Sequence, residues 1–508
     1  MFTNNAQSFL GYFWPETILI VGILLVLLWE VLYRPAPRAH AAALTVGTVV
    51  GSVVALAFVM MRRPEPASLF GGLMVWDPFA AFFKVAAALT TALAVLLAWR
   101  ARETEAMRLK GSAEFHALLL TTTLGIYLLS SATDLLTIFI GLETVSMTSY
   151  VLAGYHRRDR RASEAALKYV IYGGVASGAM LYGMSLMYGA TGATKLVEMR
   201  AAVVTAAGVA MSPMLMLAAT LVIVGFAFKI AAVPFHMWCP DVYEGAPTPV
   251  TAFFSVGPKL AGFAVFVRVF YGVFYQPGAT GPGGPDAVIP WQAVLGVVSV
   301  ASMTLGNLAA LGQTNMKRLL AYSSIAHVGY VLMGLVVATP DGLAAIVFYL
   351  VVYLAMNLGA FLVVIAMARE VGTSDDPGED LRHYQGLGVR APLVAILLAI
   401  FLFSLTGLPP LGGFVGKYYL FASVVAKGGV WYVALAVIGI LNSALSLYYY
   451  AKIVRVMFLE KPLDASPLAF ARVHTIPLVA LATPVVVLGL YWGPPLALAF
   501  RTVKFIGL

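Results

Sequence analysis

Residues 228–236, FKIAAVPFH, and residues 408–417, LPPLGGFVGK, each place a lysine and a helix-breaking proline inside a long apolar stretch. A charge at bilayer depth costs on the order of 3 kcal/mol, and backbone groups freed at a helix break must find partners in protein or in a wet cavity. Transport proteins use broken helices to build ion sites near the middle of the membrane. We therefore expect Lys229 and Lys417 to lie beside discontinuous helices inside a membrane-embedded bundle.

The composition places the whole chain in a membrane. Hydrophobic residues make up 61% of the 508 residues and charged residues only 11%, against about 25% charged residues in a soluble domain. At roughly 20 apolar residues per crossing, this length accommodates about 14 helices with short connections. Hydropathy and turn residues predict spans at 15–33, 41–61, 77–99, 114–131, 134–155, 164–189, 211–236, 248–273, 291–311, 316–338, 342–369, 392–424, 430–458 and 474–498.

These spans divide the chain into four segments. We expect an N-terminal three-helix segment (1–110), a first five-helix repeat (111–275), a second, inverted five-helix repeat (276–460) and a C-terminal helix (461–508). The odd number of helices in each repeat turns the second repeat upside down relative to the first, as in many transporters. The predicted fold class is therefore an all-α integral membrane protein with discontinuous helices seven and twelve.

Basic residues are unevenly divided between the two sets of connections. Roughly 19 Lys or Arg lie on one side and about 8 on the other, and the richer set includes residues 100–110 together with Arg157 and Arg158. The positive-inside rule then places both termini on the periplasmic side of a bacterial inner membrane. The first apolar stretch has no small-residue cleavage site, so we expect it to be retained as a helix.

Five lysines have no loop to occupy and are the first candidates for function: Lys84, Lys168, Lys229, Lys259 and Lys417. Burial disfavours the charged form of a lysine, so a buried lysine can gain and lose a proton in turnover. Lys229, Lys259 and Lys417 lie too far from their helix ends to reach the headgroups, which favours a proton relay. For Lys168, snorkelling stays a second interpretation, and for Lys84 a snorkel or a local ion pair is favoured over a relay.

Two further titratable residues extend the candidate site. Glu143 ends the intramembrane stretch DLLTIFIGLE (134–143), where a nearby lysine would keep it ionised and exchange protons with it; a static ion pair is the alternative. His327 can donate and accept near neutral pH, which suits a relay between lysines, and a packing histidine is the alternative. His236, at the end of helix seven, is expected to act as an interfacial anchor or as part of the path.

Several chemistries are excluded. The single cysteine, Cys239, allows no internal disulfide and no Cys-ligated zinc or iron–sulfur site on this chain alone. We find no phosphate-binding glycine loop, nucleophile–base pair or metal-spaced cluster, and expect neither a cofactor nor a metal here. The net charge of +9 lies in loops rather than in a basic stripe with interleaved aromatics, so nucleic acid is not an expected partner.

Long stretches of the chain resemble the antiporter-like membrane subunits of respiratory complex I, the NADH-quinone oxidoreductase. They are DPFAAFFK (77–84), ALKYVIYGGVASGAMLYGMSLMYG (166–189), FKIAAVPFHMWCPDVYEGAPTPVTA (228–252), GNLAALGQTNMKRLLAYSSIAHVGY (306–330) and LPPLGGFVGKYYLF (408–421). The resemblance implies an antiporter-like fold and a proton path through a glutamate of helix five and lysines of helices six, seven, eight and twelve. These positions are Glu143, Lys168, Lys229, Lys259 and Lys417. The chain shows no long amphipathic arm after its last span, which indicates one of the shorter members of the family.

The resemblance also implies the function and the partners. It indicates a proton-translocating subunit that couples NADH:quinone electron transfer on other subunits to proton pumping through a buried Glu/Lys/His relay. FMN, iron–sulfur clusters and quinone are expected on partner subunits, and further antiporter-like subunits and the lipid bilayer are expected neighbours. The alternatives are a subunit of a multi-subunit cation/proton antiporter and a membrane scaffold whose buried charges are purely structural.

Overall fold

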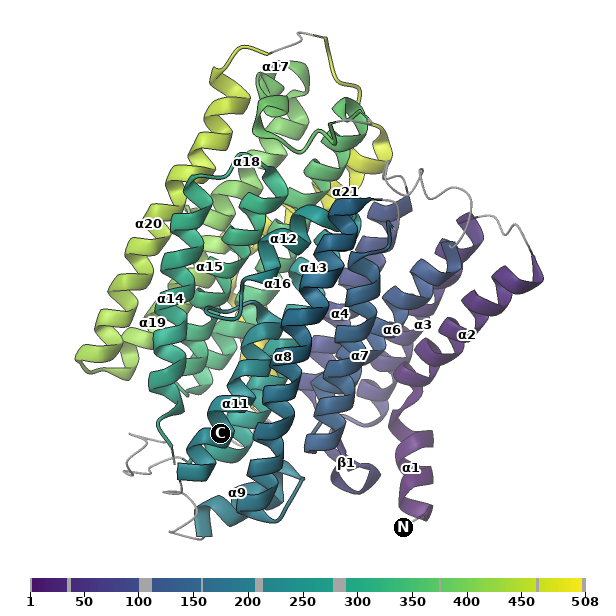
Figure 1. The fold of residues 1–508 in the computed structure, drawn as a ribbon, viewed down its shortest axis with the longest axis vertical. Coiled ribbons are helices and arrows are strands. Elements are labelled where there is room, and N and C mark those ends of the chain that lie inside the picture. Colours follow the sequence, from purple (N-terminus) through teal and green to yellow (C-terminus); the bar gives the residue numbers. More distant parts are fainter. Residues whose placement is uncertain are drawn as a thin grey trace.

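A computed structural model describes residues 2–33, 38–99, 112–156, 159–205, 213–276, 289–373, 376–462 and 466–504 of the 508-residue chain. Long helices run side by side along the vertical axis of Figure 1. The strands found in this part of the chain form one short two-stranded ribbon. The predicted all-α class is therefore confirmed.

Thirteen helices among the described residues are long and apolar enough to cross a membrane, and a further span is divided between the shorter helices α18 (Pro392–Thr406) and α19 (Gly412–Lys427). The thirteen are α2 (Trp14–Leu32), α3 (Arg38–Arg62), α4 (Pro78–Trp99), α6 (Ser112–Ser131), α7 (Leu135–Ala153), α8 (Arg160–Thr191), α11 (Pro213–Ile230), α13 (Thr248–Val269) with the π-helical turn η2 (Phe270–Phe274), α14 (Trp291–Leu311), α15 (Met316–Val336), α16 (Pro340–Val371), α20 (Val430–Leu459) and α21 (Arg472–Leu490).

Short elements connect these helices. They are α1 (Phe2–Tyr12), β1 (Ala67–Leu69), η1 (Phe70–Gly72), β2 (Met74–Trp76), α9 (Leu196–Thr205), α12 (Trp238–Gly245), η3 (Leu381–Tyr384), α17 (Leu387–Arg390) and α22 (Gly493–Val503). The last predicted span, 474–498, is wrong beyond Leu490. The chain leaves the helix at Tyr491, and α22 starts afresh with prolines in its first turn, where proline is tolerated.

Helices seven and twelve are discontinuous, as predicted. Residues 231–237 separate α11 from α12, and residues 407–411 separate α18 from α19. At the first break Ala231 adopts φ 61°, a left-handed conformation that is uncommon for a residue with a Cβ. At the second, Gly407 adopts φ 90°, which glycine tolerates without that penalty. Both breaks therefore contain a local change of backbone handedness.

Protein groups meet backbone groups that the first break frees. The Val233 amide donates to Ser302 Oγ at 3.0 Å, and Trp238 Nε1 donates to the Phe228 carbonyl at 3.1 Å. Such groups would cost several kcal/mol if left unpaired in hydrocarbon. The unwound segment is therefore held inside protein.

Equivalent helix contacts recur in the two halves of the chain. α6 packs on α7 as α14 packs on α15, and α8 packs on both α11 and α12 as α16 packs on both α18 and α19. Each half thus contains a helix pair followed by a long helix that covers a broken one. The division of the chain into two five-helix repeats stays a prediction.

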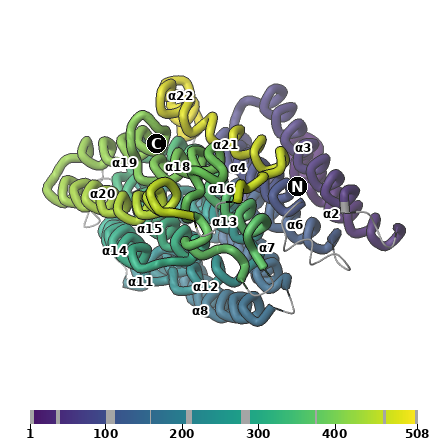
Figure 2. Tube along the Cα trace, turned by 90° about the horizontal axis from the view of Figure 1, so that it is seen from above, coloured from purple at the N-terminus to yellow at the C-terminus, as the bar shows by residue number. Residues whose placement is uncertain are grey.

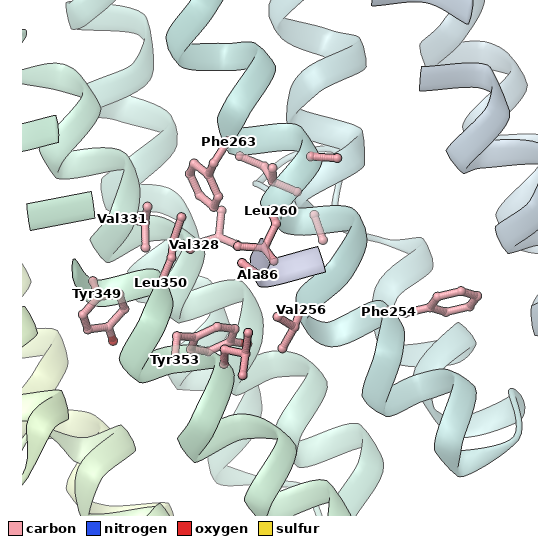
Figure 3. Packing of buried hydrophobic residues seen from close by; sticks show 14 of the residues in the cluster. Ala86, Phe254, Val256, Leu260, Phe263, Val328, Val331, Tyr349, Leu350 and Tyr353 are labelled. Carbon is pink, nitrogen blue, oxygen red and sulfur yellow. The ribbon is translucent and has the colours of Figure 1, made fainter. Parts of the chain in front are cut away.

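Burial separates the bundle into a centre and a rim. In the apolar 18-residue stretch of each helix, all residues of α13 and 94% of the residues of α15 and α16 are buried. In the same stretch of α2, α3 and α20 only 28% of the residues are buried. Figure 2 shows α13 and α16 in the middle of the bundle, with α2 and α20 at opposite ends. Leu260 and Phe263 of α13 pack with Val328 and Val331 of α15 (Figure 3). Lys259, next to Leu260, is consequently placed at the centre of the molecule.

Both chain ends lie in the lower part of Figure 1, whereas α17 and the connection before it lie at the top. Ends on the same side require an even number of crossings, which agrees with the predicted number of spans. The basic residues 100–110 and Arg157 and Arg158 lie outside the described residues.

Gly413→Ala is expected to destabilise the chain, because a Cβ at this position would lie 1.8 Å from the Ser404 carbonyl oxygen of α18. Overpacking of this kind costs about 1–3 kcal/mol. Thermal unfolding of the purified chain, followed through thiol labelling of the buried Cys239, should show a lower midpoint. Gly47→Ala is the matched control, since its Cβ would meet no atom within 4 Å. Equal midpoints for the two variants would contradict the close contact between α18 and α19.

Candidate proton-transfer site

Lys229 lies in the last turn of α11, directly before the first break, and is fully buried. Its Nζ donates to Ser146 Oγ of α7 at 2.9 Å. The end of a helix carries partial negative charge from carbonyl groups that lack helical partners, so this position favours a cation. In the described part of the chain Lys229 is therefore held by a hydroxyl rather than by a carboxylate.

Glu143 lies one turn before Ser146 on α7 and is half-buried. Its Oε1 accepts a hydrogen bond of 2.5 Å from Ser177 Oγ of α8. Glu143 acts electrostatically on Lys229 but forms no ion pair with any basic residue in the described part of the chain. The sequence predicted a direct contact between Glu143 and a lysine. In the structure Ser177 binds Glu143 and Ser146 binds Lys229 instead.

Lys168 lies apart from the other candidate lysines. Its side chain is 38% exposed, and its Nζ forms ion pairs of 2.7 Å with both Glu164 and Asp241. Asp241 of α12 also binds Arg318 of α15 at 2.7 Å, and Arg318 reaches Glu244 at 3.0 Å. Lys168 therefore belongs to an ionic cluster that ties α12 to the two helices beside it.

Lys259 is buried at the centre of α13. Its Nζ donates to Ser324 Oγ of α15 at 2.5 Å, and the same hydroxyl shares a 2.5 Å hydrogen bond with the hydroxyl of Tyr353 on α16. A hydroxyl can accept one hydrogen bond and donate another, so Ser324 and Tyr353 continue a hydrogen-bonded path that begins at the lysine.

His327 follows Ser324 by one turn of α15 and is buried. Its Nδ1 lies 2.5 Å from the Tyr349 hydroxyl and its Nε2 lies 3.3 Å from the Tyr450 hydroxyl. Tyr450 is also hydrogen-bonded to Ser323. Both ring nitrogens thus face a group that can donate or accept, which is the arrangement that a proton relay through imidazole requires.

Lys417 is buried on α19, beside the end of α18. Its Nζ donates to the carbonyl of Thr406, the last residue of α18, and to Ser443 Oγ of α20, both at 2.9 Å. The ammonium also lies 4.3 Å from the centre of the Tyr330 ring, a cation–π contact. Lys229 lies in the last turn of the first half-helix, α11, whereas Lys417 lies on the second half-helix, α19, and reaches the end of α18 only through its Nζ.

The structure brings the candidate residues together in two groups. Glu143 and Lys229 face serines of α7 and α8, while Lys259 and Lys417 both act electrostatically on His327. Glu143 and Lys229 lie on helices of the first half of the chain, and His327 and Lys417 lie on helices of the second half. Lys259 lies on α13, in the first half, but belongs to the second group, so α13 joins the two groups.

Sequence reasoning missed the tyrosines around His327. Tyr349 and Tyr353 are one turn apart on α16, a helix whose other residues near them are almost all aliphatic. A buried tyrosine hydroxyl usually has a hydrogen-bond partner, so two tyrosines on one face of such a helix were a signal of a polar path. They were overlooked because aromatic residues are also ordinary core residues in membrane helices.

Sequence reasoning also missed two of three buried ion pairs, and it gave the third only as one of two favoured interpretations. Lys84 pairs with Glu16 at 2.6 Å, which confirms the local pair favoured for Lys84. The other two join residues that sequence reasoning assigned to helix ends or loops: Asp77 with Arg268 at 2.8 Å, and Lys317 with Glu379 at 2.9 Å.

His236 is buried in the first break, four residues after Ala232. Within the described ranges no group of three or more His, Cys, Asp or Glu side chains is arranged to hold a metal ion.

Comparison with known proteins agrees with this geometry. Residues 132–443 match the family model for the transmembrane region of NADH:quinone oxidoreductase and Mrp antiporter subunits. The match covers helices from both halves of the bundle, including the two broken ones. The chain therefore belongs to the antiporter-like membrane subunits of this family.

Within that family two curated relatives that resemble the chain over nearly its whole length are named as N subunits. The NADH-quinone oxidoreductase subunit N of Anaeromyxobacter sp. (strain Fw109-5) is 46% identical over 97% of this chain and 96% of that protein. Subunit N 2 of Sorangium cellulosum (strain So ce56) is 45% identical over 99% of each chain. These matches place the chain with the N subunits of NADH-quinone oxidoreductase.

Solved structures show the same fold. A chain of respiratory complex I from Thermus thermophilus with bound Aureothin superposes with a TM-score of 0.77 at 32% identity, covering 96% of this chain and 99% of that one. A chain of the Mrp complex from Dietzia sp. DQ12-45-1b gives a TM-score of 0.81 at 23% identity, covering 98% and 97%. The second likeness concerns the fold alone. The predicted antiporter-like fold is confirmed.

Tyr349→Phe is expected to slow NADH-driven proton pumping about fivefold, because His327 would lose the hydroxyl at its Nδ1 and one hydrogen bond contributes about 1 kcal/mol. Proton uptake by inverted membrane vesicles measures the effect. Tyr271→Phe is the matched control, since it removes a buried hydroxyl that donates to the Leu335 carbonyl away from His327. Equal pumping by the two variants would count against a role for Tyr349 in the path.

Proposed function

We propose that the chain moves protons along Glu143, Lys229, Lys259, His327 and Lys417, as a membrane subunit that couples NADH:quinone electron transfer on partner subunits to proton pumping. The residue assignments rest on geometry, and the coupling to NADH oxidation rests on the family.

This proposal depends on which polar groups form hydrogen bonds with the three buried lysines. The polar atoms nearest to Lys229, Lys259 and Lys417 are serine hydroxyls and carbonyl oxygens, and none of the three has a carboxylate within ion-pair distance among the described residues. A buried cation without a counter-ion is expensive to keep charged, so a lysine in such surroundings releases its proton readily. A purely structural lysine is better served by a carboxylate, as Lys317 is by Glu379. This contrast argues against the scaffold interpretation.

The first transfer involves Glu143 and Lys229. Ser177 and Ser146 hold the two groups on neighbouring positions without letting them neutralise each other in a direct pair. A proton that arrives on Lys229 raises the positive charge beside Glu143 and strengthens their attraction. The two groups therefore titrate as a coupled pair.

The second transfer runs from Lys259 to Lys417 through His327. Ser324 and Tyr353 lie on the Lys259 side, and Tyr349 and Tyr450 lie at the imidazole. Charge on either lysine repels a proton on His327. Protonation of one lysine thus favours onward movement of a proton toward the other.

Lys168 completes the set of proposed residues but acts differently. Its two ion pairs keep it charged, and its bond to Asp241 holds α12 close to α8. We assign it to electrostatic control and positioning of the first break, from which it influences Lys229.

The partners follow from the family and from the surface. As part of this proposal, and by analogy with the family, we assign FMN, iron–sulfur clusters and the quinone site to partner subunits. α7 exposes Leu136, Ile140 and Met147 on the side where Glu143 is half-buried, and these side chains are 58–61% exposed. An apolar face that includes a carboxylate suits contact with another membrane subunit, and the remaining rim faces lipid.

A cation/proton antiporter subunit is the second function that the fold allows. The Mrp likeness is at 23% identity, whereas the relatives at 45–46% identity are N subunits. Membership of a respiratory complex is therefore favoured, and purification together with flavin and iron–sulfur subunits distinguishes the two.

Both termini are proposed to face the periplasm of a bacterial inner membrane. Alkaline phosphatase fused after Leu508 should then be active, because the enzyme folds only outside the reducing cytoplasm. A green fluorescent protein fusion at the same position should be dark. The opposite pattern would reverse the orientation.

Lys229→Ala is expected to abolish NADH-driven proton pumping through this subunit while the complex still assembles on a native gel. Among the described residues the buried lysine has no carboxylate within ion-pair distance, so its removal breaks no direct salt bridge. Lys195→Ala is the control, because Lys195 pairs with Glu198 at the surface. Normal pumping by an assembled Lys229→Ala complex would make Lys229 a structural residue.

A further inference from the structure

We infer that Asn307 is a positioning residue that determines the tautomer of His327, so that Nδ1 of the neutral imidazole is the atom that accepts a proton. Asn307 acts on the imidazole through two tyrosines of α20. The inference deepens the proposed function and rests on the role given there to His327.

Asn307 lies on α14, is fully buried, and joins α14 to α15 and α20. Its Nδ2 donates to the main-chain carbonyl of Asn442 at 3.0 Å and to the Tyr330 hydroxyl at 3.1 Å. Its Oδ1 accepts a hydrogen bond of 3.0 Å from the Tyr449 hydroxyl. Both N–H groups and the oxygen of this amide therefore have partners.

The orientation of the Asn307 amide follows from the Asn442 carbonyl. A main-chain carbonyl can only accept a hydrogen bond, so the nitrogen of Asn307 must face it. The reversed amide would place two acceptors 3.0 Å apart. The oxygen of Asn307 consequently faces Tyr449. Because an amide oxygen cannot donate, the Tyr449 hydroxyl must direct its hydrogen toward Asn307.

The side chain of Asn442 supports this arrangement. Its Nδ2 donates to the Ile438 carbonyl at 3.0 Å and to Thr304 Oγ1 at 3.2 Å. Its Oδ1 lies 3.3 Å from Asn307 Nδ2. A carbonyl thus orients the second amide as well, and α14 and α20 are joined on both sides of Asn307.

The direction of the Tyr449 hydroxyl determines that of its neighbour. The hydroxyls of Tyr449 and Tyr450 are hydrogen-bonded to each other. A hydroxyl carries one hydrogen and can accept two further hydrogen bonds. Since Tyr449 uses its hydrogen on Asn307, it can only accept from Tyr450. Tyr450 therefore donates to Tyr449.

Tyr450 is in turn the partner of the imidazole. Its hydroxyl lies 3.3 Å from Nε2 of His327 and is also hydrogen-bonded to Ser323. Because its hydrogen is directed at Tyr449, Tyr450 can only accept from the imidazole. Nε2 therefore carries the hydrogen of the neutral ring, and Nδ1 carries the lone pair.

The opposite contact of the ring agrees with this tautomer but does not determine it. The Tyr349 hydroxyl, 2.5 Å from Nδ1, could donate to a lone pair or accept from an N–H group. The oxygen of Asn307 can only accept, and this restriction decides between the two tautomers. A proton gained by His327 must then go to Nδ1, because Nε2 already carries one.

The tautomer of the native chain is the first measurement. The full chain is labelled with ¹⁵N in the rings of its seven histidines and placed in lipid vesicles, and ¹⁵N NMR distinguishes a nitrogen that carries hydrogen from one with a lone pair. Loss of a signal in His327→Gln assigns the ring. We expect hydrogen on Nε2 alone. Hydrogen on Nδ1, or on both nitrogens, would overturn the inference.

Tyr449→Phe tests the connection through α20. The variant keeps the ring but removes the acceptor of the Tyr450 hydrogen, so Tyr450 can donate to Nε2 instead. We expect the ratio of the Nε2–H to the Nδ1–H tautomer to fall about fivefold, the effect of one hydrogen bond on an equilibrium.

Tyr330→Phe is the matched control for the tautomer. It also removes a hydroxyl that is bonded to Asn307, but one at the nitrogen end of the amide, which receives a hydrogen from Asn307 instead of donating one. The ratio of tautomers should stay native. Equal ratios in the Tyr449 and Tyr330 variants would overturn the connection through Tyr449.

Asn307→Leu tests the amide itself. This variant removes the acceptor that orients Tyr449, and we expect the same fall in the ratio as in Tyr449→Phe. If Asn307 acts through Tyr449, the double variant should show no further fall, since the two residues then act in series. Summed effects in the double variant would overturn the inference. If Asn307→Leu does not fold, the native tautomer and Tyr449→Phe decide the question.

His327→Gln separates this inference from the proposed function. Its NADH-driven proton pumping is measured in inverted vesicles carrying the whole complex. Loss of pumping together with an Nδ1–H tautomer in the native chain would remove the role of Asn307 alone. Normal pumping in the assembled variant would remove His327 from the path and this inference with it.

Discussion

The hydrogen bond from Lys417 to the carbonyl of Thr406 shows the constraint on which the site depends. A helix that stops inside a bundle leaves carbonyl groups without helical partners, and in a region without bulk water those groups need a donor. A lysine supplies the donor and in return obtains a partial negative charge. At the other break the Phe228 carbonyl accepts from Trp238 Nε1 instead, and Lys229 donates to the Ser146 hydroxyl. The two breaks therefore meet the same constraint with different donors, a lysine at one and a tryptophan at the other.

The buried charges serve two different purposes. Arg268 with Asp77 and Lys317 with Glu379 are surrounded by further hydrogen bonds, and they fix connections to the helices that they join. Lys229 and Lys259 instead contact hydroxyls, which stabilise an ammonium only weakly and can exchange its proton. In the proposed path, the identity of the neighbouring oxygen thus separates a structural charge from a proton-exchanging one more clearly than depth of burial does.

The spans, the two breaks and the buried lysines could be predicted from sequence because apolar length and the cost of a charge in hydrocarbon are local properties. Contacts between distant segments could not. Asp241 falls between two predicted spans, and only the fold brings it to Lys168 and Arg318. Glu16 falls at the start of the first predicted span, and only the fold brings it to Lys84. The serines and tyrosines that contact the lysines can be more than 80 residues away in the chain, as Ser146 is from Lys229 and Tyr330 from Lys417, so no spacing rule identifies them.

The complete burial of α13 has a consequence for biogenesis. The helices that cover it, α15 and α16, end about a hundred residues later in the chain. At roughly 5–20 residues per second, a ribosome needs on the order of 5–20 s to produce them. During that interval α13 is already made, while Lys259 lacks the serine and the tyrosine that later surround it. Insertion of this chain into the membrane therefore requires a temporary polar neighbour for α13, and the insertion machinery must hold that helix back from lipid until α15 and α16 arrive.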